Sequence, residues 1–426
     1  MAREVVEVGG HIIDSLILAK ILDVILDAGA DYQMMDVEIG RTNADPSRAR
    51  LEVRAEDDET LSRLLSELQV HGANRVNQSD ARVEATTVDG VLPEDFYSTT
   101  NLPTQVRRDG HWIDVENPEM DCALVMRPDG RARTEPMHRV HAGDQVVVGR
   151  EGVRVQPLDR PRGANPFEFM TSEVSSEKPK DVLVAAVADR IRRAKAAGGK
   201  ILVVCGPAVV HTGAAPHLAQ LVRSGWVDVL FAGNGFAAHD IESNVLGTSL
   251  GVSLGGGTPA DGARSGPVSR SDGRSGHGNH LRAINEIRRR GSIASAVADG
   301  YLRSGVMYEC VTHGVPFVLG GSVRDDGPLP DVYTDVVETA DVMRTHVPGV
   351  AVALMLASTL HAIATGNLLP AGVETFCVDI NQAVVTKLAD RGSHQALGIV
   401  TDVGLFLRTL ADHLGEPAPD PAEPPG

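Results

Sequence analysis

The stretch Lys200–Asn244, KILVVCGPAVVHTGAAPHLAQLVRSGWVDVLFAGNGFAAHDIESN, decides the fold of this chain. It opens with the apolar, β-branched run Ile201–Cys205, which breaks at Gly206. A segment of helical periodicity follows, and a second apolar run, Val227–Ala232, stops at the glycine turn Gly233–Gly235. Strand, turn, helix, strand, glycine turn and helix is the order of a parallel βαβ unit. Such sheets bind ligands beyond the carboxyl ends of their strands, so both turns are expected at a binding edge.

The composition is that of a globular protein with room for two or three domains in 426 residues. Its 40 basic and 57 acidic side chains give a net charge of −17, which argues against nucleic acid or an anionic membrane as partner. No apolar run is long enough to span a bilayer, and the N-terminus lacks a signal-peptide pattern. Four cysteines without a CxxC pair favour a reducing compartment, so a cytoplasmic location is expected.

Changes of pattern divide the chain into four parts. Residues 1–90 predict a small α+β domain with two helices on one face of a sheet, similar to ferredoxin-like domains, with Ala81–Thr87 as its last strand. Such a domain could hold a small molecule or mediate dimerisation. Residues 91–165 have many turns and short strands, which indicates a β-rich unit. Residues 166–414 form the parallel-sheet α/β domain, and the Pro- and Glu-rich tail 415–426 is expected to be disordered.

Three further segments carry expectations. Phe96–Thr104 crowds hydroxyls and an amide beside two aromatic residues, and it is either a loop capped by its own side chains or a polar ligand-contact loop. Residues 255–280 are rich in Gly, Ser, Arg and Asp with little to bury, which is typical of a mobile loop or insertion. A single helix is expected over Ile293–Ser304.

Small, hydroxyl, amide or carboxylate residues recur at the end of one predicted strand after another. They are Gly206 and His211, Asn234 and Gly235, Gly320–Asp326, Ser358–His361, Asp379 and Asn381, and Asp402. Gathered at one edge, they suggest a large polar ligand with phosphates and riboses, such as a dinucleotide. The G-x-G-x-x-G fingerprint is missing after the first strand, however, and each Asp or Ser is singly as well explained as a helix N-cap.

Histidines follow three of the strands, namely His211, His239 and His361. No i,i+4 pair or Cys/His spacing supports zinc, so histidines that hydrogen-bond in the core or to a ligand are expected and no metal is predicted. Lys387 lies on the helix after the Asp379 turn, where it forms a salt bridge or serves as an amine base or carboxylate anchor. Cys205 and Cys310 have apolar neighbours and are expected to be buried thiols.

A resemblance to one family runs through the chain from Glu4 to Leu414. The segments that carry it are Phe96–Thr104, Phe167–Pro179, Gly206–Gly213, His239–Glu242, Arg324–Asp331, Thr359–His361, Cys377–Asn381, Val384–Ser393 and Val400–Gly404. In these the chain resembles the archaeal-type, NAD-dependent ornithine cyclodeaminases, which carry an N-terminal LOR/SDH (saccharopine-pathway-like) domain. A related module forms the C-terminal part of a cyanobacterial bifunctional arginine-degrading enzyme. Gly235 stands where the family pattern has Ala.

The resemblance implies a deoxyhypusine-synthase-like NAD-binding domain and conversion of L-ornithine to L-proline and ammonia. Hydride would pass to NAD+, the imine would cyclise with loss of ammonia, and hydride would return. It assigns NAD contacts to Asn234, Gly235, Asp325, Thr359, Leu360, His361, Asp379, Asp402 and Val403. For acid–base work it favours Asp326, Lys387 and His211. A homo-oligomer, either dimer or tetramer, is expected.

Two other functions fit the same scaffold. One is an NAD-dependent dehydrogenase of another amino acid, such as lysine or saccharopine, which would accumulate NADH where a cyclodeaminase does not. The other is a sensor that binds an amino acid and NAD without turnover, against which the carboxylates at several strand ends argue mildly. Substrate chain length, the carbon that gives up hydride and the oligomeric state stay open.

Overall fold

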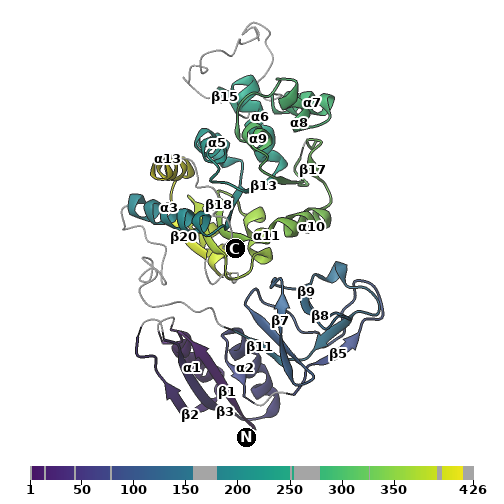
Figure 1. Ribbon diagram of the computed structural model, residues 1–426, viewed down its shortest axis with the longest axis vertical. Coiled ribbons are helices and arrows are strands. Elements are labelled where there is room, and N and C mark those ends of the chain that lie inside the picture. The colour runs from purple at the N-terminus through teal and green to yellow at the C-terminus, as the bar shows by residue number, and fades with distance from the viewer. Residues whose placement is uncertain are drawn as a thin grey trace, which may run out of the picture. The chain divides into compact units, whose positions relative to one another are not determined.

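The structure, a computed structural model, describes residues 2–13, 16–42, 45–76, 79–156, 180–249, 252–253, 279–325, 327–390 and 396–415. The chain folds as two compact units (Figure 1). The first is Met1–Ser172 together with Asn367–Gly372, and the second is Glu173–Gly366 together with Val373–Gly426. Within the described ranges, every helix is too short or too polar to cross a membrane.

The first unit begins with a four-stranded antiparallel sheet of order β2-β3-β1-β4. Its elements are β1 (Ala2–Gly10), α1 (Ile17–Asp27), β2 (Asp31–Glu38), β3 (Ser47–Ala55), α2 (Asp58–Val70) and β4 (Asn74–Arg75). Alternation along β3 buries Leu51 and Val53 against both helices. Helix α2 begins where the Asp57 carboxylate accepts the Thr60 N–H at 2.7 Å. This βαββαβ order is the expected ferredoxin-like arrangement.

A seven-stranded sheet of order β11-β6-β7-β9-β8-β10-β5 completes the first unit. Its elements are β5 (Arg82–Ala85), β6 (Thr104–Arg108), β7 (His111–Glu116), β8 (Ala123–Met126), β9 (Ala132–Glu135), the 3-10 helix η1 (Met137–Arg139), β10 (Gln145–Val148) and β11 (Val153–Val155). Ala81–Thr87 was expected to complete the small sheet, and this is wrong. β5 pairs with β10, whereas β4 takes the fourth place in the small sheet. Residue alternation reveals a strand but not its partner.

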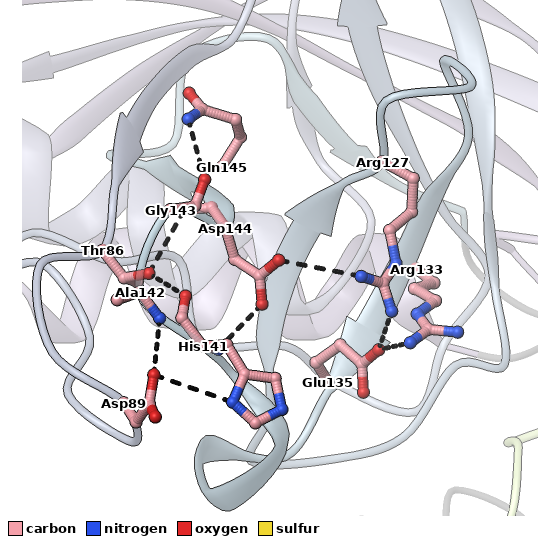
Figure 2. Close-up of polar contacts among 10 residues, drawn as sticks. All are labelled: Thr86, Asp89, Arg127, Arg133, Glu135, His141, Ala142, Gly143, Asp144 and Gln145. Carbon is pink, nitrogen blue, oxygen red and sulfur yellow. Dashed lines mark hydrogen bonds and ion pairs between the residues drawn. The ribbon is translucent and has the colours of Figure 1, made fainter.

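A polar cluster ties the β-rich sheet to a neighbouring loop (Figure 2). The buried Glu135 carboxylate accepts a hydrogen bond from Arg127 at 2.8 Å and forms an ion pair with Arg133. Arg127 also lies 3.7 Å from Asp144, which accepts the backbone N–H of His141 at 2.8 Å. The charge of Glu135 is therefore compensated inside the sheet.

The second unit is built on a seven-stranded, all-parallel sheet of order β17-β16-β13-β12-β18-β19-β20. In chain order the elements are α3 (Lys180–Ala196), β12 (Lys200–Cys205), α4 (Ala208–His211), α5 (Ala215–Arg223), β13 (Val229–Gly233), α6 (Asn234–Leu246), β14 (Thr248–Ser249), β15 (Val252–Ser253), α7 (Asn279–Arg290), α8 (Ile293–Ala298), α9 (Val306–Thr312), β16 (Phe317–Gly320), β17 (Val332–Tyr333), α10 (Val336–His346), β18 (Val350–Leu356), α11 (Leu360–Leu368), β19 (Glu374–Asp379), α12 (Gln382–Asp390), β20 (Ala396–Val400) and α13 (Val403–Leu414). The predicted α/β class with a parallel-sheet domain is confirmed.

The buried strands of this sheet read as continuous apolar runs, as expected for a sheet covered on both faces. Helices α3 and α13 lie side by side (Figure 1), joined by a hydrogen bond from Arg192 to the carbonyl oxygen of His413. Cys205 and Cys310 are buried as predicted, and burial raises the pKa of both thiols. They belong to the core.

The expected single helix over Ile293–Ser304 is wrong. Helix α8 ends before Gly300, whose φ of 77° turns the chain. Helix α9 then begins where the buried Asp240 carboxylate accepts the N–H groups of Val306 and Met307, at 3.1 and 2.9 Å. The sequence around α9 cannot show this cap, because Asp240 belongs to α6. The expected loop 255–280 and tail 415–426 lie outside the described residues, apart from the start of α7 and the residue after α13.

Candidate functional site

The sheet order places the predicted strand ends along one edge. β12 lies at the centre, with β13, β16 and β17 on one side and β18, β19 and β20 on the other. Chain order thus reverses between β12 and β18, the kind of switch point at which doubly wound sheets bind ligands. The two backbones approach closely there, because a Cβ on Gly206 would collide with the carbonyl oxygen of Ala357. Position 206 therefore requires a residue without a side chain.

Helix α6 starts directly at the end of β13 with Asn234 and Gly235. Asn234 is buried, and its Oδ1 accepts the N–H of Leu329 at 3.0 Å, which ties the start of α6 to the segment after β16. Gly235 packs against Pro207, whose Cγ would lie 3.3 Å from a Cβ at this position. The first N–H groups of a helix have no intrahelical partner, so this edge offers donors to an anion.

The His361 ring lies across the ends of β13 and β16. A Cβ on Gly233 would lie 2.9 Å from its Cε1, and one on Gly320 would lie 2.9 Å from its Nε2. These two glycines therefore make room for the imidazole. Burial lowers the pKa of His361, while nearby Asp325 acts in the opposite direction. Asp325 is itself oriented by the Ser322 N–H, which its Oδ2 accepts at 2.8 Å.

Two carboxylates at the other half of the edge bind their own backbone. Asp379 Oδ1 accepts the N–H of Asn381 at 2.7 Å, and Asp402 caps α13 by accepting the N–H of Leu405 at 2.9 Å. The N-cap alternative therefore holds for Asp402. Between them lies Thr401, whose buried hydroxyl has no hydrogen-bond partner among the described residues. An orphaned buried hydroxyl marks a place where a polar ligand atom would be satisfied.

Apolar surface is uncovered at the same edge. Leu360 and Ile380, which follow β18 and β19, have exposed fractions of 79% and 75%. Val403 is by contrast buried, so at that position only the backbone at the start of α13 faces the edge. Polar turns with exposed aliphatic side chains beside them thus lie at this edge.

Three histidines and a carboxylate gather where α4, α6 and α7 meet. The ring centroids of His211 and His239 are 4.8 Å apart, and those of His239 and His280 are 6.0 Å apart. His239 Nδ1 lies 3.1 Å from Oε2 of Glu242, a fully buried side chain. We call these four residues the histidine cluster. No group of three or more His, Cys, Asp or Glu within the described ranges is arranged to hold a metal ion.

Comparison with known proteins identifies the family. The model described as "Arginine dihydrolase ArgZ-like, C-terminal, Rossmann fold" matches residues 185–410, its first region matches 103–184, and the LOR/SDH bifunctional enzyme conserved region matches 3–102. Ornithine cyclodeaminase of Methanothermobacter thermautotrophicus is 52% identical, with 95% of this chain and 96% of the relative covered. The chain belongs to the ornithine cyclodeaminase family. The resemblance inferred from its sequence motifs is confirmed.

This member of the ornithine cyclodeaminase family is similar in structure to two kinds of solved relative. A conserved putative LOR/SDH protein from Methanococcus maripaludis has a TM-score of 0.70 at 45% identity, covering 79% of this chain and 98% of the other. The apo structure of ArgZ, a cyanobacterial arginine dihydrolase, has a TM-score of 0.81 at 37% identity, covering 97% of this chain and 58% of the other. The ternary complex of AgrE with ornithine and NAD+ has a TM-score of 0.51 at 42% identity, with the same coverage.

The described residues show no contact between the predicted acid–base residues. His211 lies in the histidine cluster, whereas His361 lies apart over the strand ends. Lys387 is exposed in the last turn of α12, and no described contact links it to His211. Asp326 falls outside the described residues. Glu242 and His280 were not among the residues predicted for the site.

The hydroxyl-rich segment Phe96–Thr104 serves mainly to hold the first unit together. The Thr99 hydroxyl donates to the carbonyl oxygen of Glu119 at 2.6 Å, and Asn101 Nδ2 donates to that of Leu369 at 3.4 Å. Both side chains are buried, which favours the capped-loop alternative. The start of the segment lines a cavity of about 610 Å³ beside α2.

Proposed function

We propose that this protein converts L-ornithine to L-proline and ammonia in an NAD-dependent reaction without net oxidation. The observation that carries the proposal is its match, along nearly the whole length of both chains, to proteins named ornithine cyclodeaminase. The relative AgrE has been crystallised with ornithine and NAD+, which supports both the substrate and the cofactor. One amine-bearing carbon becomes an imine, the second amine attacks it, ammonia leaves, and the cyclic imine is reduced.

The edge of the parallel sheet suits the cofactor. When bound, NAD+ supplies the acceptor of the substrate hydride and afterwards its donor. Three observations support the fit: the close approach of Gly206 to Ala357, the orphaned hydroxyl of Thr401, and the exposed aliphatic side chain of Ile380. The residues proposed to hold the cofactor are Asn234, Gly235, Asp325, Thr359, Leu360, His361, Asp379, Asp402 and Val403.

Proton transfer falls to the side chains of the chain itself. The carbon that bears the ammonium group cannot give up hydride until the nitrogen has lost a proton. A base that is neutral near pH 7 is therefore needed. Burial lowers the pKa of His211, with His239 adding to this effect and Glu242 opposing it, and His211 is therefore neutral at that pH. We assign this role to His211. Asp326 and Lys387 are proposed for the proton that departing ammonia requires.

Product analysis tests the proposed function. We expect purified protein with NAD+ and L-ornithine to form proline and ammonia in equal amounts, with no lasting NADH absorbance. Steady accumulation of NADH with lysine or saccharopine would instead support the dehydrogenase alternative. Thermal stabilisation by ornithine and NAD+ with no ammonia released would support the sensor.

We also propose that the protein is a cytoplasmic homo-oligomer, a dimer or tetramer. The four cysteines are free and buried, in keeping with a reducing compartment. On and beside β2, an edge strand of the ferredoxin-like sheet, the apolar side chains of Met35, Val37 and Ile39 are exposed. Such an edge pairs readily with a second copy. Light scattering that reports a monomer would refute the oligomer, and cell fractionation tests the location.

A further inference from the structure

Glu242 is the anchor of the histidine cluster. Its side chain is fully buried, and both of its oxygens have partners. The Thr248 hydroxyl donates to Oε1 at 2.8 Å, while Oε2 lies 3.1 Å from His239 Nδ1. Asn279 Nδ2 donates to the same hydroxyl at 2.9 Å, which leaves the Thr248 proton directed at Glu242. An ionised carboxylate only accepts hydrogen bonds, so His239 carries its proton on Nδ1.

This arrangement fixes how His239 faces His211. Pro207 packs against Gly235. His211 and His239 each follow four residues after one of these two, and their rings lie beside each other, with centroids 4.8 Å apart and planes inclined by 59°. One helical turn is about 5 Å, so the histidine pair lies about one turn from the start of α6. The cluster is therefore close to the edge at which the cofactor is proposed to bind.

We propose that Glu242 and His239 are positioning residues for His211, which accepts the proton of the substrate ammonium group. The inference rests on the proposed function and deepens it. In this step an N–H bond of the substrate breaks, the amine keeps the electron pair, and a new N–H bond forms on an imidazole nitrogen of His211. The positive charge that appears on His211 is offset through His239 by the carboxylate of Glu242.

Within the described ranges, the titratable side chains of the histidine cluster come from three elements. His211 itself ends α4, His239 and Glu242 lie on α6, and His280 lies at the start of α7. A second histidine beside it disfavours protonation, whereas the carboxylate favours it. Removing the negative charge at Glu242 should therefore make His211 harder to protonate. The acidic limb of the pH profile of kcat/KM, which reports the base of the free enzyme, would then move to lower pH.

The chain contains a matched control for this test. Glu309 on α9 is also buried and also pairs with a histidine, His313, at 3.1 Å, but its other partner is Arg223. Glu309→Gln thus removes another buried carboxylate beside a histidine without touching the histidine cluster. It should lower stability and leave the kcat and pH profile of the folded enzyme unchanged.

For Glu242→Gln we expect kcat to fall on the order of 10²-fold, KM for ornithine to stay within about threefold, and the acidic limb to move about one pH unit lower. His239→Gln should lower kcat in the same way. A second readout, NMR titration of the His211 ring without substrate, should show the same downward shift in Glu242→Gln and none in Glu309→Gln.

An unchanged acidic limb and an unchanged His211 titration in Glu242→Gln would overturn the inference. If that variant does not fold, Glu242→Asp keeps the charge but withdraws it from His239 by one methylene group, and it should give a smaller shift in the same direction. If the wild type makes no proline but the His211 titration still moves down in Glu242→Gln, the proposed function fails while the coupling of Glu242 to His211 stands, so the two failures are distinguishable.

Discussion

Glu135 in the β-rich sheet and Glu242 beside the parallel sheet are both buried carboxylates, but their partners differ. Glu135 lies between Arg127 and Arg133, whose guanidinium groups stay charged at every physiological pH (Figure 2). Glu242 binds a hydroxyl and the imidazole of His239, whose ring lies beside that of His211. A carboxylate between permanent positive charges, such as Glu135, has a structural role. A carboxylate bound to a histidine, such as Glu242, can instead support proton transfer. The partners of a buried carboxylate, more than its burial, thus indicate its role.

Glu135→Gln tests the structural side of this comparison and has the largest expected effect. It removes the counter-charge of Arg133 and the nearer of the two carboxylates beside Arg127, which keeps Asp144 at 3.7 Å. We expect the free energy of unfolding to fall by about 3 kcal/mol, less if Arg133, whose side chain is 37% exposed, turns to water. Urea denaturation measures the loss, and the kcat of the folded fraction should not change.

The control is Glu116→Gln, which breaks an exposed ion pair with Arg131 at 3.1 Å in the same sheet. Exposed pairs contribute little, so this variant should unfold at the same urea concentration as the wild type. If Glu135→Gln also left the midpoint unchanged, or lowered kcat without lowering stability, the contrast between the two carboxylates would collapse.

Asp240 sharpens the comparison, because it lies two residues before Glu242 on the same helix. It is fully buried and caps α9. Burial raises its pKa to about 6, although its two backbone hydrogen bonds act in the opposite direction. Between the unfolded value of 3.8 and about 6, the folded state binds more protons than the unfolded state, so this group's contribution to stability falls as pH rises.

We therefore expect the stability advantage of wild type over Asp240→Asn to shrink by roughly 2 kcal/mol from pH 4 to pH 7, since one pKa unit corresponds to about 1.4 kcal/mol. Chemical denaturation at several pH values measures this. An advantage that grew with pH would show that the carboxylate is stabilised in its charged form. The kcat profile should keep its acidic limb, in contrast to Glu242→Gln.

Local sequence pattern predicted most strands and the edge where they end, because apolar runs and polar turns are properties of neighbouring residues. It failed where partners are distant in sequence. Arg82–Ala85 was recognisable as a strand, but its pairing with β10 depends on the whole β-rich sheet. The start of α9 depends on Asp240, which comes from another helix.

The same limit applied to the candidate site. Polar residues after parallel strands were expected at one edge, and the sheet order places them there. The three-residue spacing of His239 and Glu242 was a signal for one helix face, but nothing local joins them to His211 or His280. Sequence spacing also does not show that His361 lies apart from the histidine cluster. Its position is set by two glycines, Gly233 and Gly320, on neighbouring strands.

Gly235→Ala has the smallest expected effect and tests how closely the edge fits its ligand. The new Cβ would lie 3.3 Å from Pro207 Cγ, so Pro207 must shift by a few tenths of an ångström. Alanine also favours the helix by about 0.5–1 kcal/mol, which offsets that strain. We expect little change in stability and less than about a threefold change in NAD+ affinity by calorimetry, well under the tenfold that 1.4 kcal/mol gives.

A much larger loss of NAD+ affinity with unchanged stability would mean that the cofactor touches the Gly235 backbone more closely than any side chain allows. Glycine would then be required by the ligand, as glycine is required by the chain itself at Gly206. A loss of stability with unchanged affinity would instead assign Gly235 to the packing of α6 on Pro207. Gly235 would then be a residue at the ligand edge whose role is structural, as that of Glu135 is in the β-rich sheet.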